Sequence, residues 1–182
     1  EVMGRYVGWI AIQAGLAGGA DAILIPTIPF DINKVAEKIK ERREAGKDFS
    51  IVVVAEGAKP VSGEMVVKSV VEDSPDPIRL GGIAEQVSAD LEKLVGLESR
   101  AVILGHLQRG GSPTAYDRVI STRYGNAAVE LAMEGKFGHM VTLKGNNISS
   151  VPLEEVIGKL QQVDPEGELV KTARALGISL GD

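Results

Sequence analysis

The stretch AILIPTIPFDINKVAEKIKERREAGKDFSIVVVAEG, residues 22–57, contains the patterns of a strand, a helix and a second strand in succession. Its two ends, AILIP (22–26) and SIVVVAEG (50–57), are apolar almost throughout, which is typical of strands that are buried on both faces. The segment between them has apolar residues at helical spacing, with Asp31 placed as an N-cap and Gly46 at its end. This order predicts a sheet of mostly parallel strands.

The same alternation of short apolar runs and helical patterns continues along the chain. We therefore predict an α/β fold of three layers, in which a mostly parallel sheet has helices on both faces. The other expected elements are strands at 100–106 and 139–143, helices at 4–19, 81–96, 114–135, 152–161 and 167–176, and an irregular excursion at 58–80 that carries one short strand or helix.

Composition narrows the class of protein. The 182 residues include no cysteine, which excludes disulfides, thiolate metal sites and cysteine nucleophiles and fits a reducing cytoplasm. The net charge of −5 argues against general nucleic-acid binding. Apolar runs all fall short of the ~18 residues that a membrane span needs. We expect a cytoplasmic protein with neither a nucleic-acid nor a membrane partner.

A glycine-rich loop, LGHLQRGGSP (104–113), follows the predicted strand at 100–106. Ligands of parallel sheets bind beyond the carboxyl ends of the strands, where this loop would lie. His106 and Arg109 could both donate to a phosphate, and the paired glycines would let backbone amides approach it. The alternative is a tight turn whose histidine satisfies a local carbonyl group.

Three more charged residues stand at informative places. Arg5 lies near the start of a predicted helix, where the helix dipole disfavours a cation, so it either binds an anion or is an ordinary solvated side chain. Glu56 ends a strand and could bind sugar hydroxyls, act as an acid or base, or cap a neighbouring helix. Arg100 begins the strand that leads to His106, about 20 Å away at ~3.3 Å per residue. It is therefore a surface charge or reaches a site in a neighbouring molecule.

Three segments together resemble a known family. EVMGRYVGW (1–9), VVVAEGA (52–58) and RAVILGHLQRGGSPTAYDR (100–118), in this order and at this spacing, resemble the C-terminal half of 6-phosphofructokinases. The resemblance runs from Glu1 to about Gly145 and loosely beyond. It implies a fructose 6-phosphate-binding domain at 1–137, followed by a C-terminal strand and helices at 138–182 that return toward a donor-binding domain.

The resemblance also implies roles at the sugar end of a substrate site. Met3 and Gly4 match residues that contact the fructose 6-phosphate sugar, and Glu56 matches the carboxylate that holds its hydroxyls. Arg5 matches the catalytic arginine beside the transferred phosphoryl group, where a fixed cation stabilises charge in the transition state.

At the phosphate end, the resemblance implies that His106 and Arg109 bind the 6-phosphate. Arg100 matches an arginine that reaches into the site of a neighbouring subunit, which agrees with its distance from His106 along the predicted strand. The partners implied are fructose 6-phosphate and further copies of the chain in a homodimer or homotetramer.

In this family the glycine-rich donor loop and the catalytic aspartate precede Met-Gly-Arg, whereas this sequence starts two residues before that motif. We therefore expect the general base and the donor site to lie in an N-terminal half, and these 182 residues alone to be inactive. The full enzyme would use Mg²⁺ with ATP or pyrophosphate, and we expect no metal ligand in this half. The rival hypothesis is a non-catalytic sugar-phosphate-binding or regulatory half. A related lipid or nucleotide kinase is a weaker third, against which Gly-His-x-Gln-Arg-Gly-Gly argues.

Overall fold

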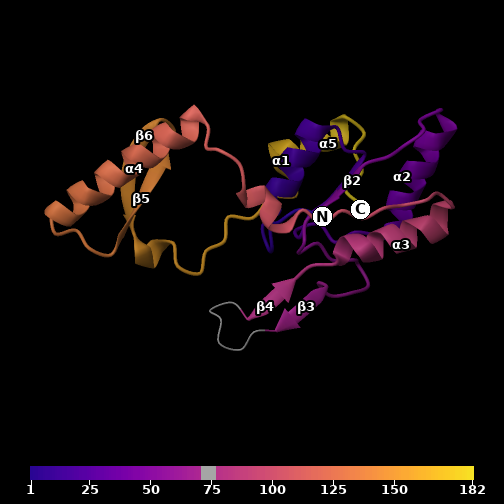
Figure 1. Cartoon of the computed structure of the whole chain (residues 1–182), viewed down its shortest axis with the longest axis horizontal. Helices are drawn as coiled ribbons and strands as arrows, with labels where there is room; N and C mark the ends of the chain where they lie inside the picture. The colour runs from indigo at the N-terminus through magenta and orange to yellow at the C-terminus, as the bar shows by residue number, and fades with distance from the viewer. Residues whose placement is uncertain (71–76) are drawn as a thin grey trace. The chain divides into compact units, whose positions relative to one another are not determined.

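The structure, a computed structural model, describes residues 1–70 and 77–182, without the side chains of residues 68–70 and 79. The chain forms two compact units, which we call unit 1 (residues 1–108 and 161–182) and unit 2 (residues 109–160) (Figure 1). Each unit is described by itself. The domain boundary expected after residue 137 stays a prediction; the two units meet in sequence at 108/109 and 160/161.

A small parallel sheet forms the centre of unit 1. Strand β1 (Ala22–Leu24) pairs with β2 (Val52–Val54), and Leu24 lies opposite Val54. Single parallel bridges extend the sheet on both sides, from Val2 to Ala55 and from Ala22 to Ser179. The N-terminal and C-terminal segments of the chain therefore lie on opposite sides of the pair β1–β2.

Helices cover both faces of this sheet. They are α1 (Trp9–Gly18), α2 (Ile32–Glu44), α3 (Ile83–Val95) and α5 (Glu168–Ala175). Ile23 and Ile25 are buried in the same apolar cluster as residues of α1 and α5, whereas Ala22, Leu24 and Val54 are buried with residues of α2 and α3. Successive strand residues point to opposite faces, so a strand between two helical layers is apolar at every position. The predicted three-layer α/β fold is confirmed.

The ends of two helices follow from particular residues. The side chain of Asp31 accepts a hydrogen bond from the backbone of Asn33 at 2.9 Å, which confirms the predicted N-cap of α2. Helix α1 begins at Trp9, five residues later than predicted. Gly4 and Gly8 have φ angles of 141° and 82°, which are not helical and which side chains rarely tolerate. The two glycines therefore hold residues 4–8 as a loop in front of the helix.

The predicted strand at 100–106 is wrong. Residues 100–104 form no ladder, and Gly105–Arg109 form a short 3-10 helix, η1. The Glu1 backbone is bonded to this run, since its nitrogen donates to Val102 O at 2.7 Å and its carbonyl accepts from Leu104 N at 3.1 Å. The apolar, β-branched pattern is that of a strand, but no neighbouring strand among the described residues pairs with it.

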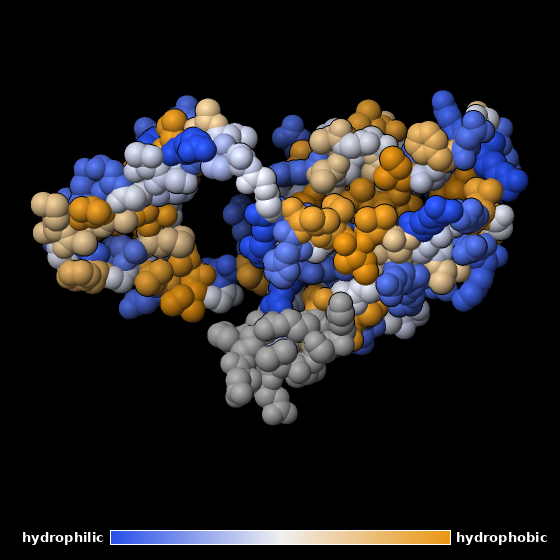
Figure 2. All heavy atoms as spheres, in the orientation of Figure 1, coloured by the Kyte–Doolittle hydropathy of each residue, from blue (hydrophilic) through white to orange (hydrophobic). Residues whose placement is uncertain are grey.

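The apolar side chains of this run remain accessible. Val102 is 64% exposed and Ile103 44% exposed. A groove of about 670 Å³ is lined by Ile51–Val54, by residues of α3, and by Ala101, Val102 and Leu104. Apolar atoms are correspondingly visible on the face of unit 1 that Figure 2 shows. No helix within residues 1–70 and 77–182 has both the length and the apolar character to cross a bilayer.

The excursion at 58–80 contains a hairpin. Strand β3 (Val67–Val70) pairs antiparallel with β4 (Ile78–Leu80). The prediction of one short strand or helix in this segment is therefore confirmed only in part, since it holds two short strands. Residues 71–76 of the predicted excursion lie outside the described residues.

Unit 2 consists of one helix packed on a hairpin. Its elements are α4 (Ala115–Met133), β5 (His139–Lys144), β6 (Asn147–Pro152) and the 3-10 turn η2 (Leu153–Glu155). The strand predicted at 139–143 exists, but it pairs antiparallel with β6 and is not a buried strand of the parallel sheet. The helix predicted at 152–161 is wrong beyond η2, because Gly158 has a φ of 76°.

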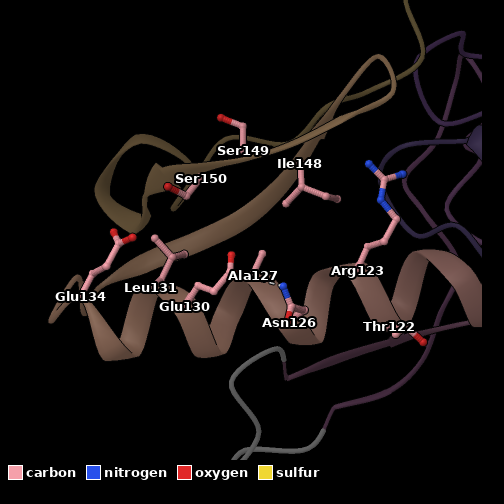
Figure 3. Close-up of a pocket in the computed structure, with 10 residues that line it drawn as sticks. All are labelled: Thr122, Arg123, Asn126, Ala127, Glu130, Leu131, Glu134, Ile148, Ser149 and Ser150. Carbon is pink, nitrogen blue, oxygen red and sulfur yellow. Dashed lines mark hydrogen bonds between the residues drawn. The ribbon is translucent and has the colours of Figure 1, made fainter.

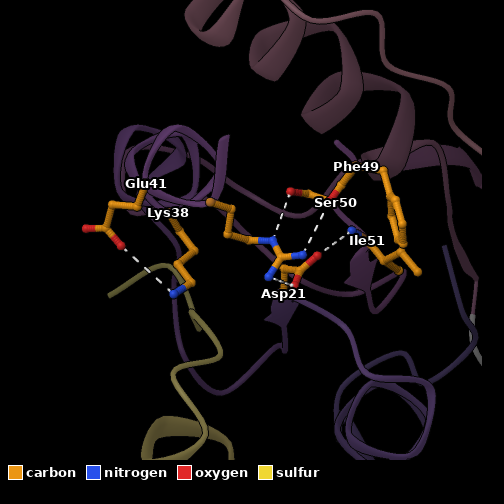
Figure 4. A network of polar contacts seen from close by, with 7 residues as sticks. Asp21, Lys38, Glu41, Phe49, Ser50 and Ile51 are labelled. Carbon is orange, nitrogen blue, oxygen red and sulfur yellow. Dashed lines mark hydrogen bonds and ion pairs between the residues drawn. The ribbon is translucent and has the colours of Figure 1, made fainter. Parts of the chain in front are cut away.

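An ion pair joins the start of the sheet to the end of α2 (Figure 4). Arg42 Nη1 lies 2.8 Å from Asp21 Oδ1, and the other oxygen of Asp21 accepts Ile51 N at 2.9 Å. Arg42 also donates to the Ser50 hydroxyl and to the Phe49 carbonyl, both at 3.3 Å. The Arg42 and Asp21 side chains are only 24% and 10% exposed, so solvent screens this contact less than a surface ion pair.

We expect Arg42→Met to lower the free energy of unfolding by about 1–2 kcal/mol, because it leaves a mostly buried Asp21 carboxylate without its cation. Urea denaturation measures this change. Arg43→Met, on the exposed neighbour, is the matched control and should change stability by less than about 0.5 kcal/mol. Equal losses in the two variants would contradict a specific role for Arg42.

Candidate functional site

The segment Glu1–Arg5 is bonded through its backbone to separate parts of unit 1. Val2 N donates to Val54 O at 2.9 Å, so the segment lies along β2. The next amide, Met3 N, donates to the side-chain oxygen of Gln108 at 2.7 Å. Two consecutive residues are thus held by a strand and by a turn that follows them by more than one hundred positions in the sequence.

Glu56 holds the next two residues. Its Oε1 atom accepts hydrogen bonds from Gly4 N and Arg5 N, both at 3.3 Å. The side chain is partly buried and comes directly after β2, at the carboxyl end where the sequence predicted a binding residue. The two amides that Glu56 accepts precede α1, which begins at Trp9, so these hydrogen bonds hold the loop and not a helix end. The structure therefore brings Gly4, Arg5 and Glu56 together.

Arg5 itself is fixed at both its side chain and its carbonyl group. Its Nη2 atom donates to the carbonyl of Ile78, at the start of β4, at 2.7 Å. Its carbonyl oxygen lies against Gly57, where an added Cβ would be 1.4 Å from that oxygen. Gly57 is therefore required by close approach of the backbone and not by its φ angle.

The carboxylate of Glu1 binds the N-terminus of α3. Its Oε2 atom accepts Gly82 N at 2.9 Å and Ala84 N at 3.1 Å. The N-cap residue Gly82 offers no side chain for this purpose, so a carboxylate from another segment satisfies free amides at the positive end of the helix dipole. This role of Glu1 was not predicted, because its one signal in the sequence is a helix start without a capping side chain.

The remaining predicted residues lie at the surface. His106 is exposed within η1, in unit 1, whereas Arg109 is exposed at the end of η1 and is the first residue of unit 2. The Arg100 side chain is 83% exposed and pairs with Glu98 at 2.7 Å. Arg100 is thus exposed at the surface of unit 1, which fits both alternatives that the sequence left open, and whether it serves a neighbouring subunit stays a prediction.

A separate pocket of about 690 Å³ lies in unit 2, between α4 and β6 (Figure 3). Its polar lining includes Arg123, Glu130 and Ser150, and none of the predicted site residues. In the described parts of the chain, no three His, Cys, Asp or Glu side chains gather in a group that could hold a metal ion.

Comparison with known proteins identifies the family. The family model described as Phosphofructokinase matches residues 1–132, well over half of the chain. The chain belongs to the phosphofructokinase family. The resemblance noted in residues 1–9, 52–58 and 100–118 is thus confirmed, and it falls within the matched region.

The individual proteins to which the chain is similar are also phosphofructokinases. The ATP-dependent 6-phosphofructokinase 2 of Clostridium perfringens is 61% identical over the whole chain, which covers 50% of that protein. The T-state structure of Pichia pastoris phosphofructokinase is 35% identical with a TM-score of 0.65, over 85% of this chain and 16% of that one. The pyrophosphate-dependent phosphofructokinase of Nitrosospira multiformis is 25% identical with a TM-score of 0.71, over 99% and 47%. The chain thus spans about half the length of the curated relatives it matches.

We expect Gly57→Ala to destabilise unit 1 by about 2 kcal/mol or more, because the new methyl group would displace the Arg5 carbonyl. Chemical denaturation followed by circular dichroism measures the loss. Gly18→Ala is the control, since nothing lies within 4 Å of a Cβ at that helical position and alanine favours a helix. A Gly57→Ala protein as stable as Gly18→Ala would show that the close approach to Arg5 is not a constraint.

Proposed function

We propose that this chain is the substrate-binding half of a 6-phosphofructokinase, which transfers a phosphoryl group from ATP to the 1-hydroxyl of fructose 6-phosphate in glycolysis. The observation that carries the proposal is the convergence of Met3, Gly4, Arg5 and Glu56 at the carboxyl end of β2. These are the positions that match the family's sugar-binding residues. Family membership supports the reaction class, a phosphotransfer between a donor and a sugar phosphate.

At the sugar end, Glu56 has two tasks. Oε1 accepts the Gly4 and Arg5 amides, and among the described residues no protein group is recorded as donating to Oε2. A carboxylate oxygen in this situation accepts hydrogen bonds from hydroxyl groups, which is the chemistry that a sugar ring offers. Gly4 would contact the same sugar because its amide is bonded to that carboxylate, and Met3, the residue before it, would lie beside them.

At the phosphate end, His106 and Arg109 would bind the 6-phosphate. Both belong to η1, and both side chains are exposed to solvent, where a dianion can reach them. A guanidinium offers a planar pair of donors to phosphate oxygens, and a histidine adds a ring N–H donor. The phosphate group would thus bind through charge-assisted hydrogen bonds.

In the reaction, the 1-hydroxyl oxygen forms a bond to the γ-phosphorus of ATP, the bond from that phosphorus to ADP breaks, and the hydroxyl proton passes to a base in the other half of the enzyme. Arg5 would stabilise the charge that develops on the transferred group. Its side chain is anchored through one nitrogen to the Ile78 carbonyl, which limits its movement. A pre-positioned cation costs little reorganisation when the charge develops.

Donor, metal, assembly and location belong to the same proposal. ATP is favoured over pyrophosphate because the 61% identical relative is named as ATP-dependent, whereas the pyrophosphate-dependent structure is 25% identical. Mg²⁺ would accompany the donor phosphates in the other half of the enzyme. Arg100 would reach a neighbouring subunit of a homodimer or homotetramer. The cysteine-free sequence supports a cytoplasmic location.

We expect the double variant His106→Ala/Arg109→Ala to bind fructose 6-phosphate at least about tenfold more weakly than the wild type, because two charge-assisted hydrogen bonds to phosphate are lost. Calorimetric titration of the chain measures this affinity. Lys40→Ala/Arg43→Ala, which removes two exposed cations from α2, controls for net charge. Unchanged binding in the His106/Arg109 variant would overturn the assignment of the phosphate end.

The 182 residues alone should show no phosphoryl transfer from ATP or pyrophosphate to fructose 6-phosphate, because the proposed base and donor site lie in the other half. A coupled assay of fructose 1,6-bisphosphate formation checks this, with the full-length Clostridium perfringens enzyme as the positive control. Turnover by the chain alone would refute the division of labour between the two halves.

A further inference from the structure

Gln108 is the residue of the 105–109 turn that faces the protein. It is partly buried, whereas its neighbours are exposed, with Leu107 79% exposed. Its side-chain oxygen accepts the Met3 amide at 2.7 Å, across a sequence separation of 105 residues. This is the shortest of the hydrogen bonds described to the backbone amides of Val2, Met3, Gly4 and Arg5.

The amides of Val2, Gly4 and Arg5 are bonded to β2 and to a residue that follows it, and not to η1. Val2 N is bonded to β2, and Gly4 N and Arg5 N are bonded to Glu56, which also follows β2. Among the hydrogen bonds described, the one from Met3 to Gln108 is the one that joins this segment to η1. The turn that carries His106 is therefore connected to the proposed sugar-binding loop through the Gln108 side chain, while Leu104, the residue before the turn, donates to the Glu1 carbonyl at 3.1 Å.

Chemistry explains why a glutamine suits this position. A buried backbone N–H needs an acceptor, and both a glutamine and a glutamate could supply one. A glutamate would place a negative charge in the turn that holds His106, two residues away, where the proposed ligand is a phosphate dianion. A neutral amide oxygen satisfies Met3 without repelling that ligand.

We propose that Gln108 is a positioning residue, which fixes the spacing between the Met3–Arg5 loop and the His106 turn so that one sugar phosphate contacts both. The inference rests on the proposed function. Its consequence is selective. Loss of the hydrogen bond lowers the affinity for a ligand that spans both segments, such as fructose 6-phosphate. The affinity for inorganic phosphate, which would bind only at the phosphate end, stays nearly unchanged.

Two isosteric variants separate these effects. Gln108→Met keeps the length of the side chain and removes the strong acceptor, whereas Gln108→Glu keeps an acceptor and adds a charge. Titrations of the chain with fructose 6-phosphate and with inorganic phosphate, followed through the Met3 amide and the His106 ring by nuclear magnetic resonance, give both affinities. Hydrogen exchange at the Met3 amide reports the hydrogen bond itself, and Leu107→Ala is the control within the same turn.

We expect Gln108→Met to weaken fructose 6-phosphate binding about tenfold, to change phosphate binding by less than about twofold, and to speed Met3 exchange about tenfold. Gln108→Glu should keep the exchange of the Met3 amide slow and should lower the affinities for both ligands. Leu107→Ala should resemble the wild type in all three measurements. If Gln108→Met lowered the affinities for both ligands equally, or lowered neither, the positioning role would be overturned and the proposed function would stand. A wild type in which fructose 6-phosphate shifts neither signal would overturn the proposed function, and the inference with it.

Discussion

One oxygen of Glu56 accepts the amides of Gly4 and Arg5, and the rest of the site depends on this contact. It fixes two successive residues at the end of β2 and leads the chain from the sheet into the loop before α1. The Arg5 carbonyl then lies so close to residue 57 that only glycine fits there. Two adjacent residues, Glu56 and Gly57, thus set the backbone path of Gly4 and Arg5, which lie more than fifty positions earlier in the sequence.

The site is assembled from segments that a parallel sheet naturally brings together. Val2 and Glu56 meet because the N-terminal segment lies along β2, and the carboxyl ends of parallel strands share one edge. Gln108 adds the third segment through Met3. Backbone amides are the common element, since three consecutive ones are held by side chains. A loop held in this way is pre-organised by the protein's own contacts.

The strands predicted at 100–106 and 139–143 differ from the structure because the pairing of a strand depends on a neighbouring strand elsewhere in the chain. Residues 100–104 have the composition of a buried strand, yet Val102 and Ile103 are exposed and form no ladder. Apolar β-branched runs indicate that a residue can pack in a sheet, and they do not reveal whether a neighbouring strand is present. The run at 139–143 was a strand as predicted, but its pairing with β6 is antiparallel, and strand direction is not encoded in a short apolar run.

The sequence by itself determined the local features: apolar β1 and β2, the Asp31 cap of α2, and the motifs at 3–5, 56 and 106–109 that identify the phosphofructokinase family. These depend on neighbouring residues or on short patterns. Only the tertiary structure decided that Glu1 caps α3, that Gly57 makes room for Arg5, and that Gln108 accepts the Met3 amide. Each of these contacts joins residues far apart in the chain, and no local pattern specifies which distant donor a side chain will meet.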